Sequence, residues 1–409
     1  MHSPNIRPVY EIVKFALKRH DFILFTFFIV NEFLSWPLLR FWNVYGSNSD
    51  FIDLRWIWHS ADCFNQVGFG IYAEKGAFCG GYQYGYSPIW LINQFGIPEA
   101  LVEPLGYMLM YFYCFIVFTH LFPALGRLKF RTSIFYLIAC SPPMMLFVQR
   151  GQIDLLVTLC AFATIRLISH RKNSNTIILF VFVLLSLISL VKLYPIIFII
   201  SIAFFSKDKR IFFLSFLTLS LLLPRLLIDL TLIPIEVGKT FEDTSMTFGF
   251  LNVFERIGQT ISFPLSSNKV LILSFLMHFL LWIAIRVPVE NSDIETNREL
   301  PSEEVNKAFE FQIWTSVFLS CYFLGNNIDF RQIFAILAVS SVCKYTRQQN
   351  IRNVLIFLLI LNVLLSFESG GLEIFGDITM AVTVIILIKY LIKSLEESFS
   401  KMRIFRISK

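Results

Sequence analysis

The chain has 409 residues, of which 56% are hydrophobic and only 16% carry a charge. Its mean hydropathy is +0.66, and 46 residues are phenylalanine. Soluble domains contain about 25% charged residues, so this composition excludes a soluble protein and indicates a protein of the lipid bilayer. The net charge of +6 does not indicate nucleic-acid binding, because the Lys and Arg residues lie in short clusters between apolar runs, where they set membrane topology.

The N-terminal residues 1–21 are charged and amphipathic, and the first apolar run lacks a small-residue cleavage site. This pattern predicts a short helix on the cytoplasmic membrane surface rather than a cleaved signal peptide.

Apolar runs recur along the rest of the chain and predict an all-α, polytopic membrane helix bundle of about twelve transmembrane helices in one domain, 1–409. The runs lie at 21–43, 99–123, 132–148, 152–169, 175–191, 193–206, 211–230, 269–287, 308–325, 329–344, 351–368 and 373–394. Around Lys192 and Pro195 the sequence allows either two helices or one broken helix. Pro195 removes a backbone donor there, and Lys192 is costly in hydrocarbon.

Basic clusters predict the orientation of these helices. With about twelve spans the clusters fall on one side, which the positive-inside rule assigns to the cytoplasm together with both termini. They are the N-terminus, 127–131, 170–172, 207–210, 344–352 and 401–409. Most of the unusual polar residues then gather on the outer side, in the segments 44–98, 149–152, 192–195, 231–268, 326–329 and 368–377.

The first outer loop, 44–98, is longer than a connection requires, and long structured connections are usually functional. Within it, a polar stripe at helical spacing predicts an amphipathic helix lying in the membrane interface. The stripe is formed by Arg55, His59, Asp62 and Gln66, with Leu54, Trp58 and Ala61 on the opposite side. Asp53 lies in the first turn, where the helix dipole favours a carboxylate. Asp53 is therefore either a functional group or a helix stabiliser beside a solvated face.

The same loop ends in a glycine- and tyrosine-rich segment, 80–88, which contains Tyr82, Tyr84 and Tyr86. Tyrosine rings with a hydroxyl are suited to stacking on a sugar, and an aromatic belt at the membrane surface is the alternative. Cys63 and Cys79 also lie in this loop and could pair if it faces an oxidising compartment.

Three further outer segments carry candidate ligands for an anion. Arg150 is followed by Gln152 and Asp154 at a helix turn, and its guanidinium can pair with a phosphate through two parallel hydrogen bonds; ordinary helix caps are the alternative. Lys192 precedes Tyr194 in an apolar stretch and is a functional candidate or a lysine that reaches the membrane surface.

The third segment, 326–331, includes Asn327, Asp329 and Arg331, and an ion pair between Asp329 and Arg331 is the alternative to a functional role. The sequence contains neither a sustained internal repeat nor a Walker-type loop, a CxxC pair, an HExxH helix or a compelling metal-ligand cluster. It therefore names no metal ligands and no cofactor, and it leaves metal dependence open.

These motifs, in this order, resemble the polytopic glycosyltransferases of the C superfamily, which use polyprenyl-phosphate-linked sugars. The likeness is to the bacterial α-mannosyltransferase-like branch and spans residues 20 to 340. The matching elements are Asp53, the aromatic segment 56–58, Gly68 to Tyr72, Tyr86-Ser87-Pro88, Gly151-Gln152-Ile153-Asp154, Lys192-Leu193-Tyr194-Pro195 and the serine-bearing segment 245–252.

The resemblance implies a transfer of a mannose-like hexose from a polyprenyl-phosphate donor to an acceptor hydroxyl of a glycolipid or glycan, with inversion. It implies an enzyme of the bacterial inner (plasma) membrane whose active site lies on the outer face. Asp53 is implied as general base, and Arg150, Lys192 and Arg331 as cations for the leaving phosphate. The implied substrate-binding residues are His59, Asp62, Tyr84, Tyr86, Gln152, Asp154, Tyr194 and Asn327.

The sequence departs from this pattern at Ser87, where a second proline is common, and in an insertion at 74–79. Two other functions remain open. A flippase or transporter of polyisoprenoid-linked glycans would place charges along a pore, whereas here the polar residues gather on one face. A polymerase or ligase of lipid-linked glycans would use a large late outer loop, and 231–268, with Glu242, Asp243 and Glu255, is only moderately long.

Overall fold

A computed structural model describes most of the chain. The described residues are 20–34, 36–37, 51–74, 86–126, 128, 130–151, 153–170, 175–191, 195–205, 208–232, 247–248, 254, 257, 267–285, 302–323, 327–328, 332–346, 348–365 and 373–407. Within them the fold is helical, as the composition predicts, with fifteen α-helices, one short 3-10 helix and one pair of two-residue strands.

The helices follow the apolar runs of the sequence closely. They are α2 (His20–Phe33), α4 (Ile52–Glu74), α5 (Tyr86–Phe95), η1 (Glu99–Leu101), α6 (Val102–Ala124), α7 (Arg131–Ala139), α8 (Pro142–Gln149), α9 (Ile153–His170), α10 (Asn175–Val191), α11 (Pro195–Phe205), α12 (Lys209–Leu232), α14 (Ser267–Ala284), α15 (Ser302–Phe323), α16 (Gln332–Tyr345), α17 (Gln349–Leu365) and α18 (Glu373–Ile407). The run at 175–191 coincides with α10, and α11 is a separate helix beyond residues 192–194, which lie outside the described part.

One expected helix, 132–148, is wrong as a single element. Residues in this run form α7 and α8, whose axes differ by 51°. The reason lies in Pro142 and Pro143, which occupy the first positions of α8 after Ser141. Proline cannot donate the backbone hydrogen bond that would continue α7, but it is well accommodated in the first turn of a new helix.

Two helical segments in the described residues are long and apolar enough to cross a bilayer, namely Glu99–Ala124 and Ile374–Glu396. The bent α7–α8 pair makes a third candidate, and several shorter apolar helices accompany them. The chain is therefore a membrane protein with candidate transmembrane helices, and the expected number of about twelve spans stays a prediction.

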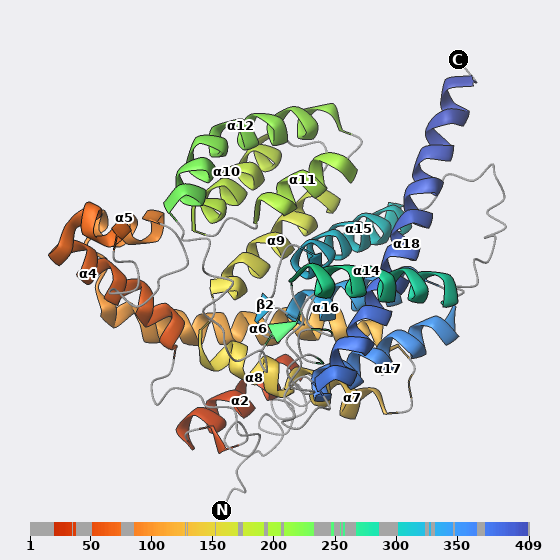
Figure 1. The fold of residues 1–409 in the computed structure, drawn as a ribbon, viewed down its shortest axis with the longest axis horizontal. Coiled ribbons are helices and arrows are strands. Elements are labelled where there is room, and N and C mark those ends of the chain that lie inside the picture. The colour runs from red at the N-terminus through yellow and green to blue at the C-terminus, as the bar shows by residue number, and fades with distance from the viewer. Residues whose placement is uncertain are drawn as a thin grey trace, which may run out of the picture.

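The helices form two groups that meet where α11 packs against α15, and α6 contacts α9 of one group and α16 of the other (Figure 1). Helices α9 to α12 lie together on one side, and α15 to α18 lie together on the other. Helix α16 is buried along its whole length from Gln332 to Cys343, as expected for a central helix. Exposed phenylalanines such as Phe216 on α12 and Phe275 on α14 are suited to contact with lipid.

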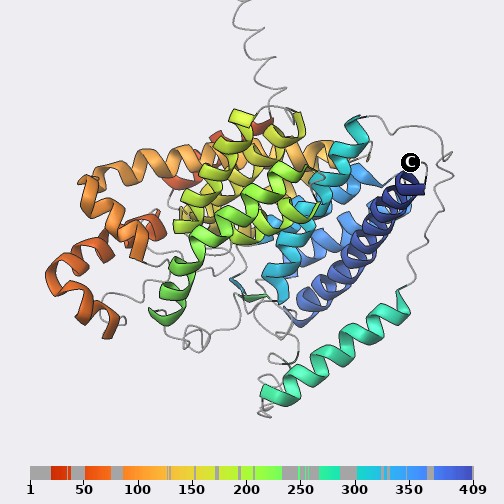
Figure 2. The same cartoon turned by 90° about the horizontal axis from the view of Figure 1, so that it is seen from above.

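Helix α14 stands apart from the bundle and runs beside α18 (Figure 2). The ammonium group of Lys389 on α18 donates hydrogen bonds to the carbonyl oxygens of Trp282 and Ile285. These carbonyls belong to the C-terminal end of α14, where backbone acceptors lack partners within the helix. A side chain of α18 thus caps α14.

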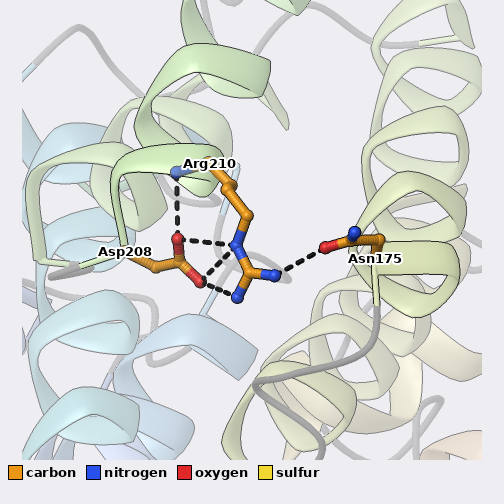
Figure 3. A network of polar contacts seen from close by, with 3 residues as sticks. All are labelled: Asn175, Asp208 and Arg210. Carbon is orange, nitrogen blue, oxygen red and sulfur yellow. Dashed lines mark hydrogen bonds and ion pairs between the residues drawn. The ribbon is translucent and has the colours of Figure 1, made fainter.

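Two polar contacts join segments that are distant in sequence. Strand β1 (Thr247–Phe248) pairs antiparallel with β2 (Asn327–Ile328), so the expected outer segments 231–268 and 326–329 meet. At the start of α12, Asp208 accepts a hydrogen bond from the backbone N–H of Arg210 at 2.9 Å. The Arg210 guanidinium also bonds to Asp208 and to Asn175 at the start of α10 (Figure 3).

Candidate active site

Helix α4 has the amphipathic form that the sequence predicts. Leu54, Trp58 and Ala61 are buried, while His59 and Asp62 on the predicted stripe are exposed. The Trp58 indole N–H donates to the carbonyl of Ile97 at 2.9 Å. Apolar burial and this hydrogen bond fix the helix against the chain that leads into α6.

The polar stripe is fastened at one point by an ionic contact. The guanidinium of Arg55 donates to Glu99 at 3.2 Å and to Glu103 at 3.0 Å. All three side chains are at least a quarter exposed, so each contact contributes little to stability. The contact nevertheless aligns the start of α4 with the start of α6.

The first turn of α4 lies on the turn between α8 and α9. The backbone N–H of Phe51 donates to the carbonyl of Gln149 at 2.8 Å, and the N–H of Asp53 donates to the carbonyl of Arg150 at 3.0 Å. These two hydrogen bonds join the beginning of the first loop to the motif that starts at Arg150. Two sequence motifs that were considered separately are therefore parts of one site.

Asp53 and Arg150 form an ion pair at this junction. The Asp53 Oδ1 atom accepts hydrogen bonds from Arg150 Nη2 at 2.7 Å and from Arg150 Nε at 3.1 Å. The Asp53 side chain is only 6% exposed, whereas that of Arg150 is 35% exposed. Charge-assisted hydrogen bonds of this kind are strong and directional, so the buried carboxylate is held in a fixed orientation beside a cation that solutes can reach.

Sequence reasoning assigned Asp53 and Arg150 to one reaction but missed their direct contact. The residues are 97 positions apart, and no spacing rule links them. It also missed Phe51 and Gly106, which lie beneath this pair. A non-glycine residue with a positive φ angle, such as Phe51, is visible only in a structure.

The other predicted site residues are placed less completely. Asp154 is fully buried in the first turn of α9, close along the chain to Arg150. Asp62 lies on the opposite face of α4 from Asp53, since nine residues along a helix amount to about two and a half turns, and His59, six residues from Asp53, also lies off its face. The structure does not bring those two residues to the ion pair, and their roles stay predictions.

Several predicted residues lie outside the described part of the chain. These are Lys192, Tyr194, Arg331, Tyr84 and Gln152, together with the side chains of Tyr86 at the start of α5 and Asn327 in β2. Among the described residues there is no group of three or more His, Cys, Asp or Glu side chains arranged to hold a metal ion.

Cys63 on α4 is disulfide-bonded. No disulfide is formed by the other cysteines within the described residues, which are Cys114, Cys140, Cys160, Cys321 and Cys343. The predicted partner, Cys79, lies outside the described residues.

Comparison with known proteins defines the class. Residues 98–226 match the model of glycosyltransferase family 87, while searches of curated proteins and of solved structures found no match. The match therefore indicates a membrane-bound glycosyltransferase. The matched segment is similar to glycosyltransferase family 87, a GT-C family of polyprenyl-phosphate-sugar-dependent membrane enzymes.

The matched segment runs from before α6 into α12 and includes Arg150 and Asp154. Asp53 precedes it. The ion pair therefore joins the matched segment to the loop that comes before it.

Proposed function

We propose that this enzyme transfers a mannose-like hexose from a polyprenyl-phosphate donor to an acceptor hydroxyl of a glycolipid or glycan. The reaction takes place on the outer face of a bacterial inner membrane, with both termini in the cytoplasm. The observation that carries the proposal is the contact between buried Asp53 and partly exposed Arg150. It puts a carboxylate base and a phosphate-binding cation within one hydrogen bond of each other.

In the proposed reaction Asp53 takes the proton of the acceptor hydroxyl as its oxygen attacks the anomeric carbon. The bond between that carbon and the phosphate oxygen breaks at the same time, and polyprenyl phosphate leaves. One base and no covalent nucleophile give inversion at the anomeric carbon. The base needs only modest strength, because deprotonation accompanies attack in the transition state.

Arg150 stabilises the negative charge that develops on the leaving phosphate. A guanidinium has five N–H donors in a planar fork, so it can bind Asp53 with one edge and a phosphate with another. A single cation then lies between two anions that would otherwise repel each other. This arrangement explains why the base and the cation are in contact rather than separated.

The disulfide at Cys63 supports the outer location, since cytoplasmic thiols are normally reduced. The basic segment 207–210, which includes the Asp208–Arg210 contact, supports a cytoplasmic location for the start of α12. Lys192 and Arg331 remain proposed as further cations for the donor phosphate, and Tyr84, Tyr86, Gln152, Asp154, Tyr194 and Asn327 as substrate-binding residues, with His59 and Asp62 at the rim.

The test is sugar transfer by purified protein from a panel of polyprenyl-phosphate sugars, comparing the wild type with Asp53→Asn. The substitution keeps the size of the side chain and removes its basicity, so transfer should fall at least a hundredfold while the protein stays folded. Asp208→Asn serves as the matched control, because it removes a carboxylate remote from the site. Equal transfer by wild type and Asp53→Asn would rule out Asp53 as the base. Absence of transfer from every donor would overturn the proposed donor class.

A further inference from the structure

Phe51, two residues before Asp53, has an unusual backbone conformation. Its φ angle is +55°, in the left-handed region that residues with a bulky side chain rarely adopt. Its side chain is 1% exposed. Strained conformations of this kind persist only where the surroundings enforce them, and they gather at functional sites.

Two glycines enclose the Phe51 side chain. A Cβ atom on Gly106 of α6 would lie 2.4 Å from the ring carbons of Phe51, so the ring fits against α6 only because residue 106 has no side chain. Gly151, with a φ angle of +61°, approaches less closely from the α8–α9 turn, where a Cβ atom would lie 3.0 Å from Phe51 Cβ. Tyr107 packs edge-on against the ring, with centroids 5.4 Å apart.

The backbone of Phe51 transmits this fit to the ion pair. Its N–H bonds to Gln149 and its carbonyl accepts the N–H of Arg55 at 3.0 Å, which begins the hydrogen bonding of α4. Asp53, between these two points, bonds through its own N–H to Arg150. The turn at Phe51 therefore determines how the first turn of α4 meets the residue that carries the guanidinium.

We propose that Phe51, seated between Gly106 and Gly151, is a positioning residue that aligns the Asp53 carboxylate with the Arg150 guanidinium for glycosyl transfer. The proposal rests on the proposed roles of Asp53 and Arg150. The packing of Phe51 between Gly106 of α6 and Gly151 of the α8–α9 turn links the first loop to the segment that matches the family. Phe51 itself does not touch the substrate.

A double-mutant cycle tests whether the packing of Phe51 against Gly106 positions the ion pair. Gly106→Ala places a methyl group where the ring lies, and we expect it to lower kcat at least tenfold with little change in the KM for donor. Phe51→Gly keeps the positive φ angle without strain but removes the ring, and it should also lower kcat. In the Phe51→Gly background, Gly106→Ala should have less than a twofold further effect, because the ring it displaces is gone.

The pH profile separates positioning from simple loss of structure. In Gly106→Ala and Phe51→Gly, the acid limb of the kcat profile should move to higher pH. The reason is that the Asp53 carboxylate is protonated more readily when it is not held against the Arg150 guanidinium. Gly376→Ala on α18 is the matched control: it also adds a methyl group at a close contact, with backbone of Leu365 at 3.3 Å. It should alter thermal stability without moving the acid limb.

Asp53→Asn is measured alongside to separate the two proposals. Full activity of Asp53→Asn would overturn the proposed base. If Asp53→Asn loses sugar transfer but folded Gly106→Ala keeps the wild-type kcat and pH profile, only the positioning role of Phe51 is overturned. If the kcat losses of Phe51→Gly and Gly106→Ala add in the double variant, the positioning role of Phe51 is also contradicted.

Discussion

Two clusters of opposite charges lie toward opposite ends of α6, and they differ in exposure. At one end, near Gly106, the Asp53–Arg150 pair has a cation that is 35% exposed. At the other end His120 Nε2 lies 2.6 Å from Glu310 of α15, and Lys344 of α16 lies 3.4 Å from the same carboxylate oxygen. These three side chains are only 1%, 10% and 15% exposed.

The difference shows which cluster can meet a substrate. A phosphate can reach Arg150 from solvent, whereas the His120 cluster is enclosed by apolar rings, including Trp314 and Phe162 packed edge-on against the histidine. Charges enclosed in this way depend on each other, because removing one leaves the others buried without compensation. The first cluster is suited to chemistry, and the second holds α6, α15 and α16 together.

The largest expected effect comes from breaking the enclosed cluster. Glu310→Gln removes the carboxylate that His120 and Lys344 share, and we expect it to destabilise the fold by about 3–5 kcal/mol. Thermal unfolding of the purified protein in detergent measures this loss. Sugar transfer per folded molecule should stay close to that of the wild type. A large fall in transfer by fully folded Glu310→Gln would contradict the assignment of this cluster to stability.

Arg150→Lys should show the opposite pattern. Lysine keeps the positive charge but cannot bind a carboxylate and a phosphate through a planar fork. Loss of a comparable transition-state donor lowers kcat about 10²-fold, and we expect Arg150→Lys to approach that loss while the melting temperature changes by only a few degrees. Steady-state kinetics beside a melting curve make the test. Sugar transfer by Arg150→Lys at the wild-type rate would show that the planar guanidinium of Arg150 is not needed for the reaction.

The smallest effect concerns an exposed ion pair, Asp208 with Arg210. The hydrogen bond from Arg210 holds the pKa of Asp208 below its usual value of about 3.8. A carboxyl group with a lowered folded-state pKa adds stability above its unfolded pKa, and this contribution is lost as the pH falls through the folded value. Asp208→Ala also removes the cap of α12, so it should cost about 1 kcal/mol at pH 7 and less near pH 3.

Melting curves of wild type and Asp208→Ala at both pH values check this expectation, with Asp208→Asn, which retains a capping side chain, as the control. A cost that grows as the pH falls would show that the carboxylate charge is unfavourable there.

Much of the fold was predictable because apolar runs and helix boundaries are local properties. The run at 175–191 coincides with α10, and the amphipathic stripe of α4 lies as its spacing predicts. The break at Pro142 was visible in the sequence, but the apolar character of 132–148 outweighed it in the prediction. Helix-breaking residues therefore deserve more weight than hydropathy when a span is short.

The candidate site was predictable only in part. The types of Asp53 and Arg150 indicated a base and a phosphate ligand, but their contact depends on how α4 docks on the α8–α9 turn. His120 and Glu310 lie within apolar runs and gave no signal, because a sequence does not show which helices will face each other. The backbone strain at Phe51 depends on its packing between Gly106 and Gly151, and these three residues come from three separate segments.

The docking of Asp53 on Arg150 also constrains how often the chain crosses the bilayer between them. Two segments joined by backbone hydrogen bonds lie on the same side, so an even number of crossings separates them. Among the described residues between 53 and 150, the candidate crossings are α6 and the bent α7–α8 pair. If α6 spans the membrane, α7 and α8 must together make the return passage, and their 51° bend is then a break within one span rather than a re-entrant loop.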